Sequence, residues 1–258
     1  MDLALKGRVA LVTGAGSQIG FGHAIALALA GDGCDVVAND LDLMGAEKTA
    51  EGVRALGPRS LAVQADVTSS QEVARMVKTV LDKMGRIDIL INNAGGPGAA
   101  GGPFVNTREE DWAPTFDLIL KAPMLCCKAV LPGMIARKYG KIINISSGLG
   151  RSGGPFSTVY SSCKAGVIGF TKSLAAEVAP LGINVNSVSP GLSTTNFLRD
   201  KQGKLRNPES LEKVRATIPL GRLTEPRDVA PLVAFLVSDL ASDIVGQTFG
   251  IEGGRYMV

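Results

Sequence analysis

The stretch RVALVTGAGSQIGFG, residues 8–22, contains an apolar segment, a glycine-rich turn and the beginning of a helix. Residues 8–13 have the continuous apolar character of a strand that is buried on both faces of a sheet. The glycines allow a sharp turn, and they allow a pyrophosphate to approach the amides at the N-terminus of a helix over residues 22–30. A tight turn without a ligand is the alternative. The order strand, turn, helix favours a dinucleotide-binding unit.

Short segments rich in valine and isoleucine alternate with helical patterns along the rest of the chain. The further strands are expected at residues 35–38, 60–65, 87–91, 141–145, 184–188 and 248–251. Apolar strands joined by helical crossovers predict a parallel sheet covered on both faces, and crossover handedness favours a doubly wound α/β topology, the Rossmann fold. We find no linker and no internal repeat. We therefore predict a single dinucleotide-binding and catalytic domain over residues 1–258.

Residues 195–219 interrupt this alternation. The first part of this stretch is polar, and a short helical pattern follows within it at residues 209–216. A long insertion near the carboxyl ends of the strands is a common place for an active-site lid, so we predict a substrate lid at about residues 193–219. Its basic residues either form a solvated surface or meet an anionic substrate, such as a carboxylate or a CoA thioester. These residues are Arg199, Lys201, Lys204 and Arg206.

Composition excludes several classes of protein. The 258 residues carry a net charge of only +3 and contain no long basic run, so a nucleic-acid-binding stripe is absent. The sequence has no run of about 18 apolar residues, so we predict no membrane span, and residues 1–8 do not resemble a signal peptide. The cysteines show no CxxC spacing, and His23 is the only histidine. We expect neither a metal site nor a disulfide framework, and we expect a cytoplasmic location.

Asp40 is the first candidate cofactor residue outside the glycine-rich turn. It follows the second expected strand, where a dinucleotide-binding fold presents a carboxylate to the adenosine ribose. A carboxylate accepts hydrogen bonds from ribose hydroxyls and repels a 2′-phosphate. The next residues are Leu41 and Asp42, so no cation is available for such a phosphate. The position favours NAD over NADP, with a solvated loop aspartate as the alternative.

Tyr160 and Lys164 form the candidate proton-transfer pair. They are four residues apart in a helical segment and therefore lie on one helix face. A tyrosine has an ordinary pKa of about 10, and a nearby cation favours the phenolate. Such a pair alone is often a surface feature. Ser147 follows the expected strand at residues 141–145 and can hydrogen-bond a substrate oxygen; Ser146 is the neighbouring candidate.

In chain order, these motifs resemble those of the short-chain dehydrogenase/reductase family, and the resemblance covers essentially the whole chain. The matching segments are the glycine loop from Thr13 to Gly22, Asp66-Val67, Asn92-Asn93-Ala94-Gly95, Ser147, Tyr160-Ser161-Ser162-Cys163-Lys164, and Pro190-Gly191 with Thr195. The resemblance is to the branch with the Tyr-xxx-Lys spacing that includes 3-oxoacyl reductases. It implies hydride transfer between a nicotinamide cofactor and an alcohol or ketone.

The resemblance also implies individual roles. Tyr160 would be the acid in reduction and the base in oxidation, Ser147 would orient the substrate oxygen, and Lys164 would bind the nicotinamide ribose and lower the pKa of Tyr160. With the preference indicated by Asp40, the cofactor would be NAD, and no metal is expected. Its contacts would come from Gly14, Ser17, Ile19, Gly20, Gly22, Asp40, Asp66, Val67, Asn93, Gly95, Tyr160, Lys164, Pro190, Ser193 and Thr195.

Two departures from the family pattern stand out. The glycine loop is two residues longer than the usual TGxxxGxG, a lengthening also seen in the enoyl-reductase branch, although Tyr160 and Lys164 keep the alcohol-dehydrogenase spacing. In addition, Ile119 occupies the position of a fourth catalytic residue, an asparagine that holds a proton-relaying water. Isoleucine cannot bind such a water, so another group or water chain must replace it, or turnover must suffer.

We therefore predict an NAD-dependent oxidoreductase that interconverts a secondary alcohol and its ketone, with a hydroxyacyl compound or CoA thioester among the candidate substrates. One alternative is an NADP-dependent 3-oxoacyl reductase, which Asp40 disfavours. Another is a weakly active structural subunit of a hetero-oligomer, which Ile119 favours and the intact Tyr160 disfavours. Because family members usually form tetramers, we expect a homotetramer; the segments at residues 229–237 and 249–258 are compatible with one.

Overall fold

The computed structural model of the protein describes residues 2–96, 98, 100–195, 198, 204 and 208–257. Within them, seven parallel strands form one sheet in the order β3-β2-β1-β4-β5-β6-β7. The strand order reverses between β1 and β4, as in a doubly wound fold, so the predicted Rossmann fold is confirmed. The strands are β1 (Val9–Thr13), β2 (Asp35–Asp40), β3 (Ser60–Gln64), β4 (Ile89–Asn92), β5 (Gly140–Ile145), β6 (Ile183–Pro190) and β7 (Thr248–Ile251).

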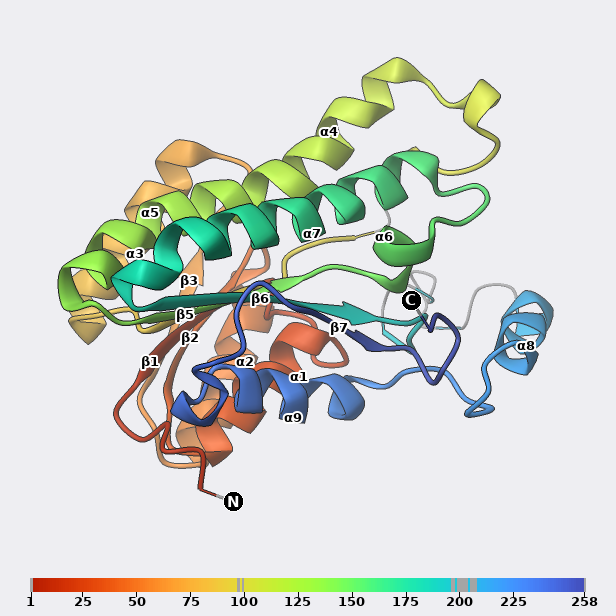
Figure 1. The fold of residues 1–258 in the computed structure, drawn as a ribbon. Helices are drawn as coiled ribbons and strands as arrows, with labels where there is room; N and C mark the ends of the chain where they lie inside the picture. The colour runs from red at the N-terminus through yellow and green to blue at the C-terminus, as the bar shows by residue number, and fades with distance from the viewer. Residues whose placement is uncertain are drawn as a thin grey trace.

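Helices cover both faces of the sheet (Figure 1). One layer holds α1 (Phe21–Gly31), α2 (Leu43–Ala55) and α9 (Pro226–Leu236). The other holds α3 (Ser70–Met84), α4 (Trp112–Phe116), α5 (Ala122–Arg137) and α7 (Thr158–Val178). Two short helices, α6 (Gly148–Ser152) and α8 (Pro208–Ala216), lie toward the end at which the arrows of β6 and β7 point.

The central strand β1 explains why both layers are needed. All five of its residues are buried. Ala10 and Val12 pack in the core cluster that includes residues of α1 and α9, whereas Val9 and Leu11 pack in the cluster that includes residues of α3 and α5. Successive side chains of a strand point to opposite faces. The continuous apolar sequence of β1 therefore reflects burial on both sides.

The helical stretch Glu109–Arg137 is one of the main elements of the second layer. Among the described residues, it is the one helix long and apolar enough to cross a bilayer by length and composition, with a mean hydropathy of 1.6. It runs alongside α7 above the sheet (Figure 1). Such packing is typical of a helix that covers a sheet. A helix in that position is apolar because one of its faces is buried against the core.

The region of the predicted lid is described in part. The helical pattern expected at residues 209–216 corresponds to α8. Arg199, Lys201 and Arg206 lie outside the described residues, and Lys204 is exposed. Ser193 forms a parallel bridge with Thr224 directly after β6. The lid itself stays a prediction.

Candidate active site

A cavity of about 1010 Å³ runs along the carboxyl ends of the strands. Ligands of doubly wound folds bind at this edge. We call the part lined by Gly14, Ser17, Gly20, Asp40 and Asp66 the loop end, and the part lined by Ser147, Tyr160 and Lys164 the helix end. The predicted site residues that line the cavity are Gly14, Ser17, Gly20, Asp40, Asp66, Val67, Asn93, Gly95, Ser147, Tyr160, Lys164, Pro190, Ser193 and Thr195.

Two predicted cofactor residues, Ile19 and Gly22, lie outside the lining of this cavity. The Ile19 side chain is 42% exposed. A methyl group at Gly22 would lie 2.4 Å from the carbonyl oxygen of Gly14 and 2.6 Å from Nδ2 of Asn93. Gly22 is therefore required for close packing of α1 against the loop. A contact of either residue with a cofactor stays a prediction.

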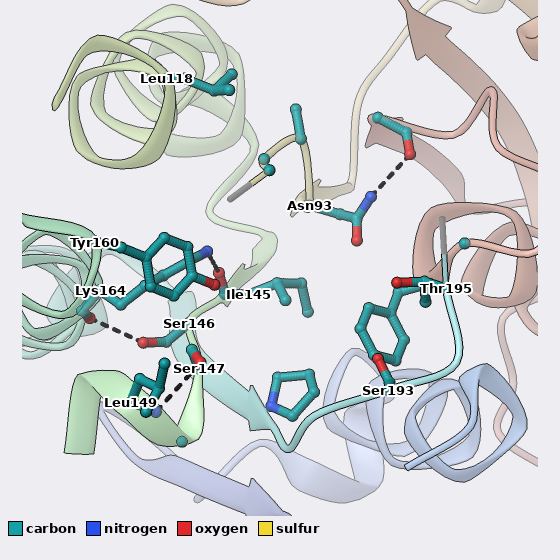
Figure 2. A pocket seen from close by; sticks show the side chains of 18 of the residues that line it. Asn93, Leu118, Ile145, Ser146, Ser147, Leu149, Tyr160, Lys164, Ser193 and Thr195 are labelled. Atoms are coloured by element: carbon teal, nitrogen blue, oxygen red, sulfur yellow. Dashed lines mark hydrogen bonds between the residues drawn. The ribbon is translucent and has the colours of Figure 1, made fainter. Parts of the chain in front are cut away.

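Asn93 holds the glycine loop to the end of β4. Its Nδ2 donates hydrogen bonds to the carbonyl oxygens of Thr13 and Gly14, each at 2.9 Å. Its backbone amide donates to the Thr13 hydroxyl at 3.1 Å. Figure 2 shows Asn93 on the far side of the cavity from Tyr160. The asparagine thereby holds the start of the glycine loop in place at the loop end of the cavity.

Gln18, in the lengthened part of the glycine loop, fastens the loop to α2. Its Nε2 lies 2.9 Å from the carbonyl oxygen of Gly16 and 3.0 Å from that of Gly45, and 3.2 Å from Oγ1 of Thr49. The Thr49 hydroxyl donates to the carbonyl oxygen of Ala15 at 2.6 Å. A methyl group at Gly45 would lie 2.5 Å from the Gly16 oxygen, so only glycine permits this approach. The extra residues thus form a structured clamp.

Asp40 is held rigidly at the loop end. Its Oδ2 accepts a hydrogen bond from the amide of Gly16 at 2.7 Å, and its Oδ1 accepts one from the amide of Asp42 at 3.1 Å. Beside it, the buried Oδ1 of Asn39 has no hydrogen-bond partner among the described residues. Buried acceptors are normally paired. A fixed carboxylate at this position fits the hydroxyl donors of a ribose.

Asp66 is held in a similar way after β3. Its Oδ1 accepts hydrogen bonds from the amide and the hydroxyl of Thr68, at 2.8 and 2.7 Å. The Asp66 amide donates to Oε2 of Glu72 at 2.8 Å. Val67 is buried in the core cluster beneath it and still lines the cavity. This arrangement fits an adenine ring lying on Val67, as the resemblance implies.

The two neighbouring serines after β5 have different partners. Ser146 Oγ donates to the carbonyl oxygen of Lys164 at 2.8 Å and so joins β5 to α7. Ser147 is the N-cap of α6, and its Oγ accepts a hydrogen bond from the Leu149 amide at 3.2 Å. Both line the cavity, but Ser147 presents its oxygen on the side of the Tyr160 ring (Figure 2). The geometry therefore favours Ser147 as the substrate-orienting serine.

Tyr160 and Lys164 project from α7 into the helix end. Lys164 Nζ donates to the carbonyl oxygen of Ile145 at 2.7 Å and lies 5.8 Å from the centroid of the Tyr160 ring. Burial lowers the pKa of Lys164 to about 8. Burial also raises the pKa of Tyr160, against a lowering contribution from a hydrogen bond with Ser147. The predicted lowering of the Tyr160 pKa is therefore not seen, because loss of hydration disfavours the phenolate more than its neighbours favour it.

Ile119 lies beside this pair. It is 1% exposed and belongs to a π-helical turn, Asp117–Lys121, between α4 and α5. From the position of a methyl group at Gly95, Ile119 Cδ1 would be 3.4 Å away and Lys164 Nζ 3.9 Å away. Ile119 packs in an apolar cluster with Val159 and Cys163, against which the Tyr160 ring lies. The lysine is thus bordered by apolar side chains where the family would place an amide.

The fold, with a tyrosine, a lysine and a serine converging on the cavity at its switch point, defines an enzyme of the nicotinamide-dependent oxidoreductase class. A model of the family described as enoyl-(acyl carrier protein) reductase matches residues 14–255. A 3-oxoacyl-[acyl-carrier-protein] reductase of Synechocystis is 42% identical over 256 residues, covering 98% of this chain and 99% of the relative. The chain belongs to the short-chain dehydrogenase/reductase family.

Further relatives agree with this assignment. A 3-oxoacyl-[acyl-carrier-protein] reductase of Vibrio cholerae is 38% identical over 254 residues, covering 98% of this chain and 99% of the relative. The crystal structure of a putative short-chain alcohol dehydrogenase from Sinorhizobium meliloti has a TM-score of 0.91 and 30% identity, covering 99% of this chain and 98% of that one. An NAD⁺-bound xylitol dehydrogenase has a TM-score of 0.89 and 30% identity, covering 97% of this chain and all of that one (100%).

Several cavity residues were not anticipated from the sequence, and Arg255 and Tyr256 are two of them. Arg255 and Tyr256 follow β7 and line the helix end together with Gly148 and Leu149. No motif marks them. The available signal was topological, because the carboxyl end of every strand in a parallel sheet falls on the same edge. The segment after β7 therefore had to pass near the site.

Proposed function

We propose that this chain interconverts 3-hydroxyacyl and 3-oxoacyl compounds, with NAD(H) as the cofactor. The observation that carries the proposal is the pairing of Tyr160, Lys164 and Ser147 with the Asp40 carboxylate at opposite ends of one cavity. Full-length similarity to 3-oxoacyl-[acyl-carrier-protein] reductases supports the substrate class. The fixed carboxylate of Asp40 supports NAD, because the same position would repel a 2′-phosphate.

The residues of the helix end divide the chemistry between them. When bound, the nicotinamide cofactor supplies or accepts the hydride. In reduction, the Tyr160 O–H bond breaks as its proton passes to the ketone oxygen, which becomes the hydroxyl of the alcohol. In oxidation, the Tyr160 phenolate takes that proton back. The Ser147 hydroxyl orients the substrate oxygen, and Lys164 lies close enough to favour the phenolate electrostatically.

The residues of the loop end would bind the other half of the cofactor. Gly14 and Gly20 would line the pyrophosphate, Asp40 would accept from the adenosine ribose, and Asp66 would meet the adenine amino group. Ser193 and Thr195 would hold the carboxamide of the nicotinamide.

Because burial raises the pKa of Tyr160, alcohol oxidation should accelerate with rising pH, whereas ketone reduction should not.

Oxidation of a polyol with NAD⁺ is a second candidate function. The observation that favours it is the NAD⁺-bound xylitol dehydrogenase among the similar structures, together with Asp40. A third reading, a weakly active subunit, depends on Ile119. An experiment separates them: acetoacetyl-CoA with NADH or NADPH, and xylitol with NAD⁺, while absorbance of the reduced cofactor is followed.

We expect the enzyme to reduce acetoacetyl-CoA with a higher kcat/KM for NADH than for NADPH. A preference for NADPH would overturn the cofactor assignment and leave the substrate class. Turnover of xylitol alone would favour the polyol function. Cofactor binding without turnover of any compound would favour the subunit reading.

A cytoplasmic homotetramer is part of the proposal. All four cysteines are free and buried, as suits a reducing compartment. Exposed apolar side chains on α5, including Met124 and Ile135, offer an association surface together with α7. Sedimentation of the purified protein tests the assembly, and a monomer at micromolar concentration would overturn it.

A further inference from the structure

The helix end contains a cation that the reaction itself does not use. Among the described residues that line the cavity, the cationic ones are Lys164 and Arg255. Lys164 donates to the Ile145 carbonyl oxygen and belongs to the proton-transfer pair. Among the described residues, the Arg255 side chain forms no ion pair, and its guanidinium carbon lies 5.2 Å from the centroid of the Tyr256 ring. The half-buried guanidinium therefore has hydrogen-bond donors left for a ligand.

The path of the chain fixes where Arg255 lies. Gly253 and Gly254 precede it, with φ angles of +64° and +85°. A methyl group at Gly253 would lie 2.6 Å from Cγ2 of Ile218, and one at Gly254 would lie 3.2 Å from Cγ of Pro219. Only glycine tolerates this combination of backbone and contacts. The Leu220 amide also donates to the carbonyl oxygen of Gly253 at 3.0 Å. The turn is therefore anchored on both sides.

An ion pair joins the same segment to α6. Arg151 Nη1 lies 3.3 Å from Oε2 of Glu252, and the two side chains are only 16% and 3% exposed. A methyl group at Gly250 would lie only 2.1 Å from that nitrogen, so the Arg151 side chain fits here only because residue 250 of β7 is a glycine. Because Ser147 caps α6, the Glu252 pair ties the arginine-bearing tail to the helix of the orienting serine.

Tyr256 brings Arg255 close to the reacting groups. Its ring packs against Gly148, where a methyl group would lie 2.6 Å from Cδ2. Gly148 follows Ser147 directly. One aromatic ring thus separates the Arg255 guanidinium from the start of α6. A substrate whose oxygen is held by Ser147 would have its remaining atoms in the same cavity as this cation.

We propose that Arg255 binds an anionic group of the substrate, a carboxylate or a phosphate, and so sets the preference of the enzyme for charged ketones. This inference rests on the proposed function and names a specificity residue for it. Guanidinium groups bind both kinds of anion through two parallel hydrogen bonds. A neutral polyol would gain nothing from this contact. The basic residues of the predicted lid are not needed for it.

The test compares three ketones that share one reacting group. Acetoacetate carries a carboxylate, acetoacetyl-CoA carries phosphates, and ethyl acetoacetate is neutral. For Arg255→Gln we expect KM to rise about 10- to 100-fold for at least one anionic ketone, with kcat little changed. The neutral ester should keep its KM. The anion that responds identifies the source of the charge.

Two control variants accompany the test. Arg255→Lys should restore only part of the affinity, because ammonium lacks the paired donors of guanidinium. Arg227→Gln removes an exposed cation on α9 outside the cavity lining and should change no KM. Equal KM changes for charged and neutral ketones, or no change for either anion, would overturn the proposal.

Failure of the proposed function is distinguishable from failure of this inference. Calorimetric titration of each ketone into protein saturated with NAD⁺ measures binding without turnover. If the wild type reduces none of the ketones but Arg255→Gln still weakens binding of an anionic one, the anion site stands and the proposed reaction falls. If the wild type binds all three ketones equally, the anion site falls.

Discussion

At the loop end, polar side chains are held in place by backbone hydrogen bonds, whereas at the helix end the polar groups are surrounded by apolar side chains. Asp40 accepts from two amides, and Gln18 contacts two carbonyl oxygens. Burial, by contrast, raises the pKa of Tyr160 and lowers the pKa of Lys164, and so favours the neutral form of each side chain. Hydrogen bonds fix geometry, and burial tunes protonation. Substitutions at the loop end should therefore alter affinity, and substitutions of the proton-transfer pair at the helix end should alter rate.

Replacing Tyr160 tests the helix end most severely. Tyr160→Phe removes the transferable proton and keeps the ring packed in its apolar cluster. Loss of a general acid costs about 10²- to 10⁴-fold in rate, so we expect kcat to fall by that factor. Fluorescence titration should show NADH affinity within a factor of about two, since no hydrogen bond at the loop end changes. A large loss of NADH affinity would break the proposed separation of the two ends.

Replacing Asp40 tests the loop end. Asp40→Ala removes the acceptor proposed for the ribose and the negative charge that opposes a 2′-phosphate. We expect the ratio of kcat/KM for NADH over NADPH to fall about 10- to 100-fold. Steady-state kinetics with both cofactors measure this ratio. Asp82→Ala, which removes an exposed carboxylate of α3, is the matched control. An unchanged ratio would show that Asp40 does not select the cofactor.

Replacing Gln18 tests whether the clamp between the loop and α2 contributes to binding. Gln18→Ala removes its contacts to Gly16 and Gly45. We expect KM for NADH to rise about 5- to 10-fold at constant kcat, the value of one or two hydrogen bonds. Thr49→Val interrupts the same network, and the double variant should cost less than the sum of the two single ones. Strict additivity would mean that the two residues act separately.

The sequence predicted the strands well because their signal is local. Continuous apolar segments place all seven strands within about two residues of their observed ends, which is the usual scatter of such boundaries. The site residues follow from the glycine loop and the motifs at strand ends. Gln18, Thr49 and Arg255 could not be assigned, because their roles depend on contacts between segments far apart in the chain. Burial likewise decides the pKa direction of Tyr160, and a four-residue spacing does not report burial.

Ile119 offers the smallest and most diagnostic change at the helix end. Ile119→Asn introduces the asparagine that the family resemblance predicts at this position, within a π-helical turn whose neighbours are apolar. A buried amide without full hydrogen bonding costs about 1–3 kcal/mol, so we expect the free energy of unfolding to fall by that amount in denaturant titrations. We also expect kcat to stay unchanged or to rise, because the amide borders Lys164 and provides a place for a relaying water.

Ile119→Val separates these two effects. It should cost about 0.5–1.5 kcal/mol in stability through lost packing and leave kcat unchanged, since no polar group is introduced. If Ile119→Asn instead abolishes turnover while circular dichroism shows an intact fold, the apolar wall beside Lys164 is itself required for catalysis. The proton of Tyr160 would then have to reach solvent by a route that avoids this turn, and the position would not correspond to the family asparagine in function.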